Sequence, residues 1–245
     1  MTLTPEETCT TFRVYPNDYM KQNHLTINNI ILLHCLVIII LFLPIISFHT
    51  VMLNKILFTS MICFGIFSLD FVKRTQMILI GFGTVTIVLN WINYFISSDV
   101  LKLVFFFSFF FYNLFIVAFM VRHIANSDKV NVAIIINSIN GYLLIGLLGA
   151  LLLAMAELLQ KFIYHLGEGA INFAGGSAQG FHVFVYFSFI TLTTLGYGDV
   201  TPVSAIAKSA TLIIAVSGQF YLTILVAMLV GKYLGNPEKK DDMVE

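Results

Sequence analysis

The stretch Thr191-Leu192-Thr193-Thr194-Leu195-Gly196-Tyr197-Gly198-Asp199 lies between two long hydrophobic runs in the C-terminal part of the chain. Its two glycines are separated by one residue. Glycine adopts positive φ more readily than other residues, so this spacing favours a backbone that alternates between left- and right-handed conformations. Such a backbone turns consecutive carbonyl oxygens to the same side. A bare cation in an apolar medium costs on the order of tens of kcal/mol, and a row of carbonyl oxygens would replace its water.

The composition around this stretch is that of a membrane protein. Hydrophobic residues make up 58% and charged residues 11% of the 245 residues, and the mean hydropathy is +0.91. Stretches close to the roughly 20 apolar residues that cross a bilayer recur along the chain. The formal net charge is zero, so no excess of basic residues favours a nucleic-acid partner. The sequence therefore excludes a soluble globular domain and predicts no nucleic-acid binding.

Hydropathy predicts an all-α membrane protein with six transmembrane helices, one re-entrant helix and the glycine-containing loop. The apolar segment 181–193 is only about a dozen residues long, which suits a re-entrant helix rather than a full span. The expected spans are 29–50, 52–72, 76–97, 101–121, 130–159 and 203–234.

Basic residues predict the orientation, because cytoplasmic loops of membrane proteins carry an excess of Lys and Arg. With both termini in the cytoplasm, nine basic residues lie inside and four outside, which together are the 13 of the chain. We therefore expect a multi-pass protein of the cell membrane with the glycine-containing loop at its outer face. The inside set is Arg13, Lys21, Lys73, Arg74, Arg122, Lys129, Lys232, Lys239 and Lys240, and the outside set is Lys55, Lys102, Lys161 and Lys208.

The pattern T-x-x-T-x-G-Y-G, from Thr191 to Gly198, resembles the selectivity-filter signature of the tetrameric potassium channel superfamily. In that family, rings of carbonyl oxygens from four such segments take the place of the ion's water. The resemblance implies K+ as the permeant ion, no cofactor, and a homotetramer with three further identical subunits, because one segment cannot enclose an ion. The predicted filter residues are Thr194, Leu195, Gly196, Tyr197 and Gly198, with K+ held at the first four.

The segment before the filter departs from the family's commonest pattern. Many members carry two adjacent tryptophans that brace the filter, whereas this chain has Tyr186 and Phe187. The Tyr186 hydroxyl is able to hydrogen-bond Asp199, whereas Phe187 packs but has no donor. Together with Thr191 these residues are the predicted filter support.

The last apolar run carries Gly218 at the position of the family's inner-helix hinge glycine. Helix bends are commonly assigned to glycine. A close-packing contact at Gly218 is the alternative. Steps of four residues from Gly218 lead along one helical stripe to Leu222, Val226 and Val230, the predicted cavity wall and inner gate.

The fifth run contains two further features. Small residues allow helices in membranes to approach closely, so Gly141, Gly146 and Gly149 are predicted packing sites. Glu157 lies near the end of the run. In voltage-gated relatives a similarly placed glutamate anchors the outer helix to the pore region, and solvation at the membrane interface is the alternative for Glu157.

The fourth run decides whether a voltage sensor is present. A sensor needs several basic residues in sequence, because each charge moved is worth about 2.3 kcal/mol per 100 mV. This run has Lys102 at its start and Arg122 at its end, with no ladder between them. The predicted domains are a cytoplasmic segment (1–28), a four-helix sensor-like domain without gating charges (29–122), a pore domain (130–234) and a short cytoplasmic tail (235–245).

Together these features predict a potassium-selective channel that conducts K+ passively and is not classically voltage-gated. A weakly selective cation channel and a non-conducting regulatory membrane subunit are the alternatives. An enzyme is disfavoured, because no polar residues at catalytic spacing occur within or beside the spans.

Overall fold

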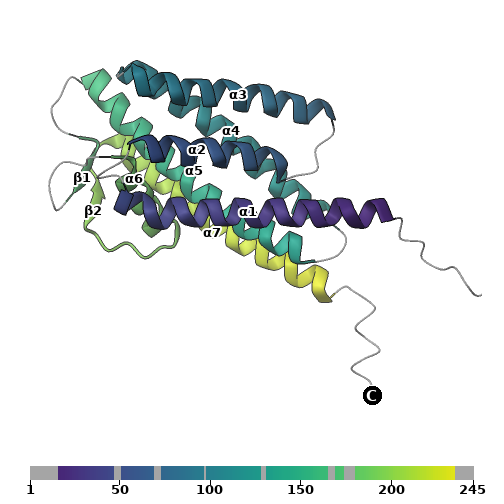
Figure 1. The fold of residues 1–245 in the computed structure, drawn as a ribbon. Helices are drawn as coiled ribbons and strands as arrows, with labels where there is room; N and C mark the ends of the chain where they lie inside the picture. The colour runs from purple at the N-terminus through teal and green to yellow at the C-terminus, as the bar shows by residue number, and fades with distance from the viewer. Residues whose placement is uncertain are drawn as a thin grey trace, which may run out of the picture.

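The structure is a computed structural model that describes residues 16–46, 51–68, 73–96, 98–127, 131–164, 169–173 and 180–234. Within these residues the chain is almost entirely helical (Figure 1). In chain order the elements are α1 (Pro16–Ile46), α2 (Val51–Phe67), α3 (Lys73–Phe95), α4 (Asp99–Asn126), α5 (Val132–Tyr164), β1 (Ile171–Phe173), α6 (Phe181–Leu192), β2 (Val200–Pro202) and α7 (Ala205–Leu234).

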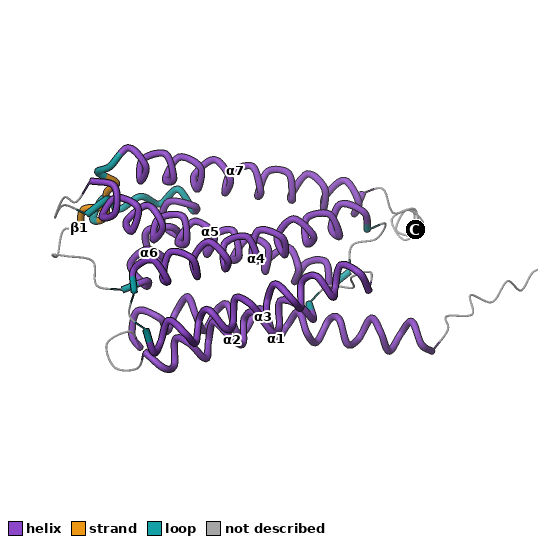
Figure 2. Tube along the Cα trace, turned by 90° about the horizontal axis from the view of Figure 1, so that it is seen from above, coloured by secondary structure: helices purple, strands orange, loops and turns teal. Residues whose placement is uncertain are grey.

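The long helices lie side by side, as two perpendicular views show (Figures 1 and 2). In Figure 2, α7 lies on one side and α1, α2 and α3 on the other, with α4 and α5 between them. α5 is the central helix and packs against α1, α4, α6 and α7. The short elements α6, β1 and β2 lie together at one end of the bundle, which we call the α6 end (Figure 1). The start of α1 and the end of α7 lie at the opposite end.

Four of the described helices are long and apolar enough to cross a membrane. The chain is therefore an all-α, multi-pass membrane protein. Burial differs greatly among these helices: 67% of the most apolar window of α5 is buried within the chain, but only 17% of that of α7. The candidate spans are Lys73–Phe95, Asp99–Asn126, Val132–Phe162 and Ala205–Lys232.

The first two expected spans, 29–50 and 52–72, are described only in part. Within the described residues, the apolar part of α1 covers Thr26–Phe42. In α2 the apolar part is Met52–Phe67. Among the described residues four helices thus meet the length of a full crossing, and six spans stay a prediction.

Several sequence-based expectations concern residues outside the described ranges. The N-terminal segment as far as residue 15 and the tail from 235 to 245 belong to this group. So do the basic residues Arg13, Lys129, Lys239 and Lys240.

The phenylalanine-rich sequence of α4 presents two different faces. Phe105, Phe109 and Tyr112 are buried, and the Tyr112 hydroxyl donates to the carbonyl oxygen of Ile62 at 2.5 Å. Phe111 on another side of the helix is exposed. The helix thus packs against α2 with one face and leaves large apolar side chains on the other.

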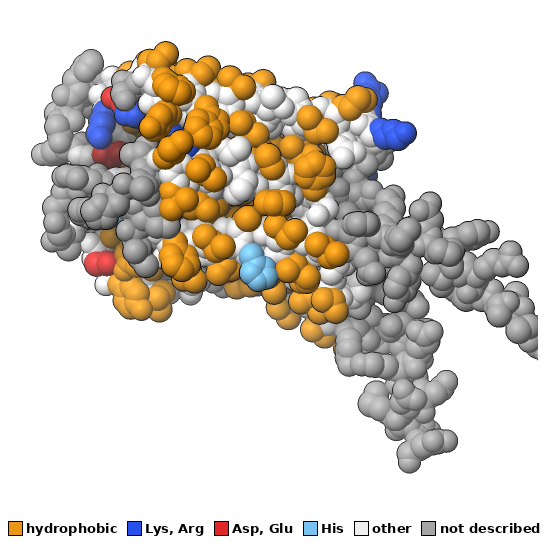
Figure 3. Space-filling view, in the orientation of Figure 1, with side chains coloured by type: hydrophobic (Ala, Val, Ile, Leu, Met, Phe, Trp, Pro, Cys, Tyr) orange, Lys and Arg blue, Asp and Glu red, His pale blue; other side chains and the backbone are white. Residues whose placement is uncertain are grey.

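Apolar side chains also cover much of the outer surface. In the face drawn in Figure 3, hydrophobic side chains spread over the middle of the bundle, and the coloured charged side chains lie toward its two ends. A band of this kind suits a lipid environment, because the hydrocarbon core of a bilayer penalises charge.

The glycines of α5 are sites of close helix packing, as the sequence predicts. An ideal Cβ on Gly146 would lie 2.4 Å from the ring of Phe189, and one on Gly149 would lie 2.3 Å from the hydroxyl of Ser188. A Cβ on Gly141 would similarly meet Tyr221. Side chains of α6 and α7 therefore approach α5 closely at these positions, and a larger residue there would require them to shift.

Candidate functional site

The helix α6 leads into the candidate site and positions its backbone. This helix ends at Leu192, and the N–H of Thr193 still donates to the carbonyl oxygen of Phe189 at 3.0 Å. Its buried face packs against α5, where the Ser188 hydroxyl donates to the Gly146 carbonyl at 2.6 Å. The short apolar segment expected at 181–193 is thus a helix of 12 residues, fixed in the bundle.

The backbone that follows α6 alternates in handedness. Positive φ occurs at Thr194 (58°), Gly196 (53°) and Gly198 (80°), that is, at every second residue. This is the alternation that the spacing of the two glycines predicts. Thr194 was not predicted to adopt positive φ, because a β-branched residue pays about 1–2 kcal/mol for this conformation.

Hydrogen bonds to the last turn of α6 hold this backbone in place. The N–H of Thr194 donates to the Thr191 carbonyl at 3.0 Å. The N–H groups of Leu195 and Gly196 both donate to the carbonyl of Ile190, at 2.9 and 3.2 Å. Carbonyls at a helix C-terminus otherwise lack partners, so the loop and the helix end stabilise each other.

On the far side of the loop, Asp199 is bonded to α6. The Tyr186 hydroxyl donates to Asp199 Oδ2 at 2.7 Å, as the sequence predicts. The other oxygen, Oδ1, accepts the N–H of Val200 at 3.1 Å. The bond to the carboxylate raises the pKa of Tyr186 to about 12. Phe187 is buried beside Tyr186 and contributes packing only.

We expect the Tyr186–Asp199 bond to appear as a shifted tyrosine titration. The Tyr186 phenol donates this hydrogen bond only while it is protonated. The contribution of the bond to the stability of the folded protein is therefore complete below pH 10 and is lost as the pH rises through about 12. The difference in ultraviolet phenolate absorbance between the unmodified protein and Tyr186→Phe should show this late titration. In Asp199→Asn, Tyr186 should titrate closer to pH 10, and an unshifted Tyr186 in the unmodified protein would contradict the bond.

A pair of short strands ties the segments before α6 and after the loop together. β1 and β2 are antiparallel, with Asn172 opposite Thr201. Directly before β1, the carbonyl of Ala170 accepts the N–H groups of Val203 and Ser204 at 2.9 and 3.1 Å. Sequence reasoning missed this pair, because strands of three residues are too short to show an alternating pattern.

Glu157 of α5 anchors the same connection. Its Oε2 accepts the N–H of the buried Ala170 at 2.7 Å, and its Oε1 lies 3.6 Å from Lys161 Nζ. Gly169 fits closely beside it, since a Cβ there would lie 2.9 Å from Oε1. Of the two alternatives for Glu157, the contacts favour an anchor to the loop region over solvation at the interface.

Glu157→Ala should lower the stability of the folded protein by about 1–3 kcal/mol, because it leaves the buried Ala170 N–H without an acceptor. Glu157→Gln keeps an acceptor oxygen and should cost less. Thermal denaturation of the purified protein would measure both. Lys161→Met is the control and should be close to neutral, because this ion pair is largely exposed on the lysine side. Equal losses for Gln and Ala would show that charge, rather than the hydrogen bond, is what matters.

Among the described residues, the loop and part of α7 have exposed apolar side chains. Leu195 is 55% and Tyr197 68% exposed, and an ideal Cβ on Gly196 or Gly198 would meet nothing within 4 Å. The predicted cavity stripe is also exposed, and it consists of Leu222 (38%), Val226 (55%) and Val230 (49%). The loop and this stripe of α7 are therefore both exposed within the described part of the chain.

Gly218 of α7 is in close contact with the end of α6. An ideal Cβ on Gly218 would lie 2.6 Å from the carbonyl oxygen of Leu192 and 2.7 Å from its side chain. The packing contact that the sequence left as an alternative is thus present. The hinge role of Gly218 stays a prediction.

Among the described residues no cluster of three His, Cys, Asp or Glu is placed to hold a metal ion. His182, on the first turn of α6, is an isolated titratable group whose pKa is lowered by burial.

Comparison with known proteins bears on the C-terminal part of the chain. Residues 151–234 match a family model described as "Ion channel", and the match extends from the second half of α5 to the end of α7. No curated protein and no solved structure matched the chain. The matched region contains every element of the candidate site, and it points to an ion channel rather than an enzyme.

Proposed function

We propose that this chain is one subunit of a potassium-selective channel. In this proposal, peptide oxygens from Thr194 to Tyr197 replace the water around a K+ ion. The observation that carries the proposal is positive φ at residues 194, 196 and 198 in a loop held by the end of α6. Consecutive carbonyls on one side of a strand are what a dehydrated cation requires.

A homotetramer supplies the rest of the site. One loop offers oxygens from one side only, and cyclic symmetry with three more copies surrounds an axis. The exposed side chains of Leu195, Tyr197 and Val226 support this assembly, because each would lie near the axis or a neighbouring subunit rather than in water. The same axis would place the α7 stripe around an inner cavity that closes by dewetting.

The proposed topology has six spans, with both termini in the cytoplasm of a cell-membrane protein. Support comes from α1 and α2, which lie alongside the four candidate spans (Figure 1). Apolar stretches of this length cross a bilayer when flanking polar side chains extend to the interface and the bilayer thins locally. This arrangement puts the α6 end outside.

Opening is proposed to be independent of voltage. In α4, Lys102 pairs with Asp99 at 2.8 Å in the first turn, and Arg122 lies in the last turns of the helix. No basic residue lies between them in the sequence. Because the middle of the helix carries no charge, the membrane potential has no gating charge there to displace.

Reversal potentials of the purified protein in planar bilayers test the proposal. With K+ on one side and Na+ on the other, we expect a reversal potential near the K+ equilibrium value. A value near zero would instead indicate a weakly selective cation channel. Absence of any current from an assembled oligomer would indicate a non-conducting regulatory subunit.

A further inference from the structure

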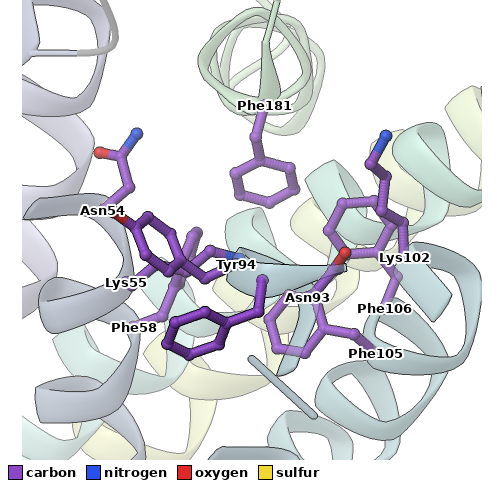
Figure 4. Close-up of a pocket in the computed structure, with 10 residues that line it drawn as sticks. Asn54, Lys55, Phe58, Asn93, Tyr94, Lys102, Phe105, Phe106 and Phe181 are labelled. Carbon is purple, nitrogen blue, oxygen red and sulfur yellow. The ribbon is translucent and has the colours of Figure 1, made fainter. Parts of the chain in front are cut away.

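A cavity of about 780 Å³ lies between the four-helix part of the chain and α6 (Figure 4). It is lined by residues near the α6 ends of α2, α3 and α4 and by Phe181 from the first turn of α6. Phe181 lies 5.5 Å from Phe58 and 5.7 Å from Phe106, measured between ring centroids. Phe105 continues this aromatic lining, so much of the wall is apolar.

Two lysines give the cavity a positive charge. Lys55 from α2 and Lys102 from α4 both line it. Lys102 is paired with Asp99, but no carboxylate of the described residues lies within ion-pair distance of Lys55. The ammonium of Lys55 instead lies 5.4 Å from the ring centroid of Phe105. With two cations and one carboxylate, the cavity favours an anionic ligand.

Two asparagines indicate a second property of the ligand. The side-chain oxygens of Asn54 and Asn93, two residues that also line the cavity, are buried and have no hydrogen-bond partner among the described residues. A buried acceptor without a donor costs about 1–3 kcal/mol. A ligand that carries a hydroxyl group besides its negative charge would satisfy these oxygens.

The rim of the cavity suits a hydrocarbon tail. Tyr94 and Phe95 at the end of α3 line the cavity and are exposed on the surface of the bundle. Lysine and tyrosine side chains at the ends of spans are typical of the membrane interface. A lipid fits this combination better than a free soluble anion, because most of the lining would remain unused by a head group alone.

We propose that this cavity binds the head group of an anionic phospholipid that also carries hydroxyl groups, such as phosphatidylglycerol. Its phosphate lies near Lys55 and Lys102, and its hydroxyls face Asn54 and Asn93. One acyl chain leaves over Phe95 into the bilayer. The site adjoins the first turn of α6, so the lipid would contact the helix that holds the candidate filter. The binding itself does not depend on the ion that the protein conducts.

Native mass spectrometry of the detergent-solubilised full-length protein, titrated with phosphatidylglycerol, tests this site. At about 1 kcal/mol per lysine, Lys55→Gln or Lys102→Gln should weaken binding roughly fivefold and the double variant roughly 30-fold. Lys208→Gln removes an exposed lysine near the start of α7, outside the cavity, and should leave the affinity unchanged. The double Arg variant keeps both charges and should retain binding, which separates lost charge from misfolding.

Three results would overturn the proposal. Equal affinity for phosphatidylcholine would remove the requirement for an anion. Equally tight binding of free glycerol phosphate would show a site for a soluble anion instead of a lipid. An unchanged affinity in the double Gln variant would show that the bound lipid lies elsewhere on the protein.

Discussion

Gly196→Ala is expected to abolish potassium flux from proteoliposomes while the protein still folds and assembles. The residue has a φ of 53°, and its amide donates to the Ile190 carbonyl at 3.2 Å. Alanine adopts this conformation at a cost of about 1–2 kcal/mol. Among the described residues, its Cβ would meet no atom within 4 Å, so no clash with them opposes folding. The backbone avoids this cost by rotating to negative φ, which turns a carbonyl oxygen away from the proposed ion path.

Gly81→Ala is the matched control for this substitution. Gly81 lies within α3, and an added Cβ there would also meet nothing within 4 Å. It has no positive φ, so alanine should leave flux unchanged and favour the helix slightly. Both variants should run as the same oligomer in size-exclusion chromatography. Undiminished flux from an assembled Gly196→Ala protein would refute the assignment of this loop as the filter.

The parts of the fold that depend on local composition could be predicted from the sequence. Each long apolar run became a helix, and the short run before the loop became α6. The handedness at Gly196 and Gly198 could also be predicted, because only glycine reaches positive φ at low cost. In each case the residue type itself restricts the backbone.

The parts that depend on distant neighbours could not be predicted in this way. Thr194 has positive φ because the hydrogen bonds at the end of α6 fix the chain around it, whereas its own preference opposes that conformation. The bond between Glu157 and Ala170 joins residues on either side of the α5–β1 connection. The cavity between Lys55 and Phe181 exists only once four helices have packed. Hydropathy carries no information on which faces of the helices pack against each other.

Gly218→Ala is expected to lower stability and conduction together. The new methyl group would lie 2.6 Å from the carbonyl oxygen of Leu192, a backbone atom that cannot change rotamer. Either α7 or the end of α6 has to shift, and overpacking of this kind costs about 1–3 kcal/mol. A shift of the α6 end would also move the Ile190 carbonyl that holds Leu195 and Gly196. Thermal denaturation and flux from the same preparation would measure both effects.

Gly231→Ala is the control in the same helix, since a Cβ there meets nothing within 4 Å. Alanine should slightly stabilise α7 at this position. If Gly218 acts only as a hinge, Gly218→Ala would instead change channel opening and leave the denaturation midpoint unchanged.

A second-site variant separates the two contacts that an added methyl group would make at Gly218. Leu192→Ala removes the side-chain atoms that lie 2.7 and 3.1 Å from the ideal Cβ, but it leaves the carbonyl at 2.6 Å. In a double-mutant cycle, Leu192→Ala should therefore restore only part of the stability that Gly218→Ala loses. Full restoration would show that the side chain, and not the backbone carbonyl, requires glycine at this position. Partial restoration would place the requirement on the backbone that leads directly into the loop of the candidate site, where glycine keeps α7 close enough to support that loop.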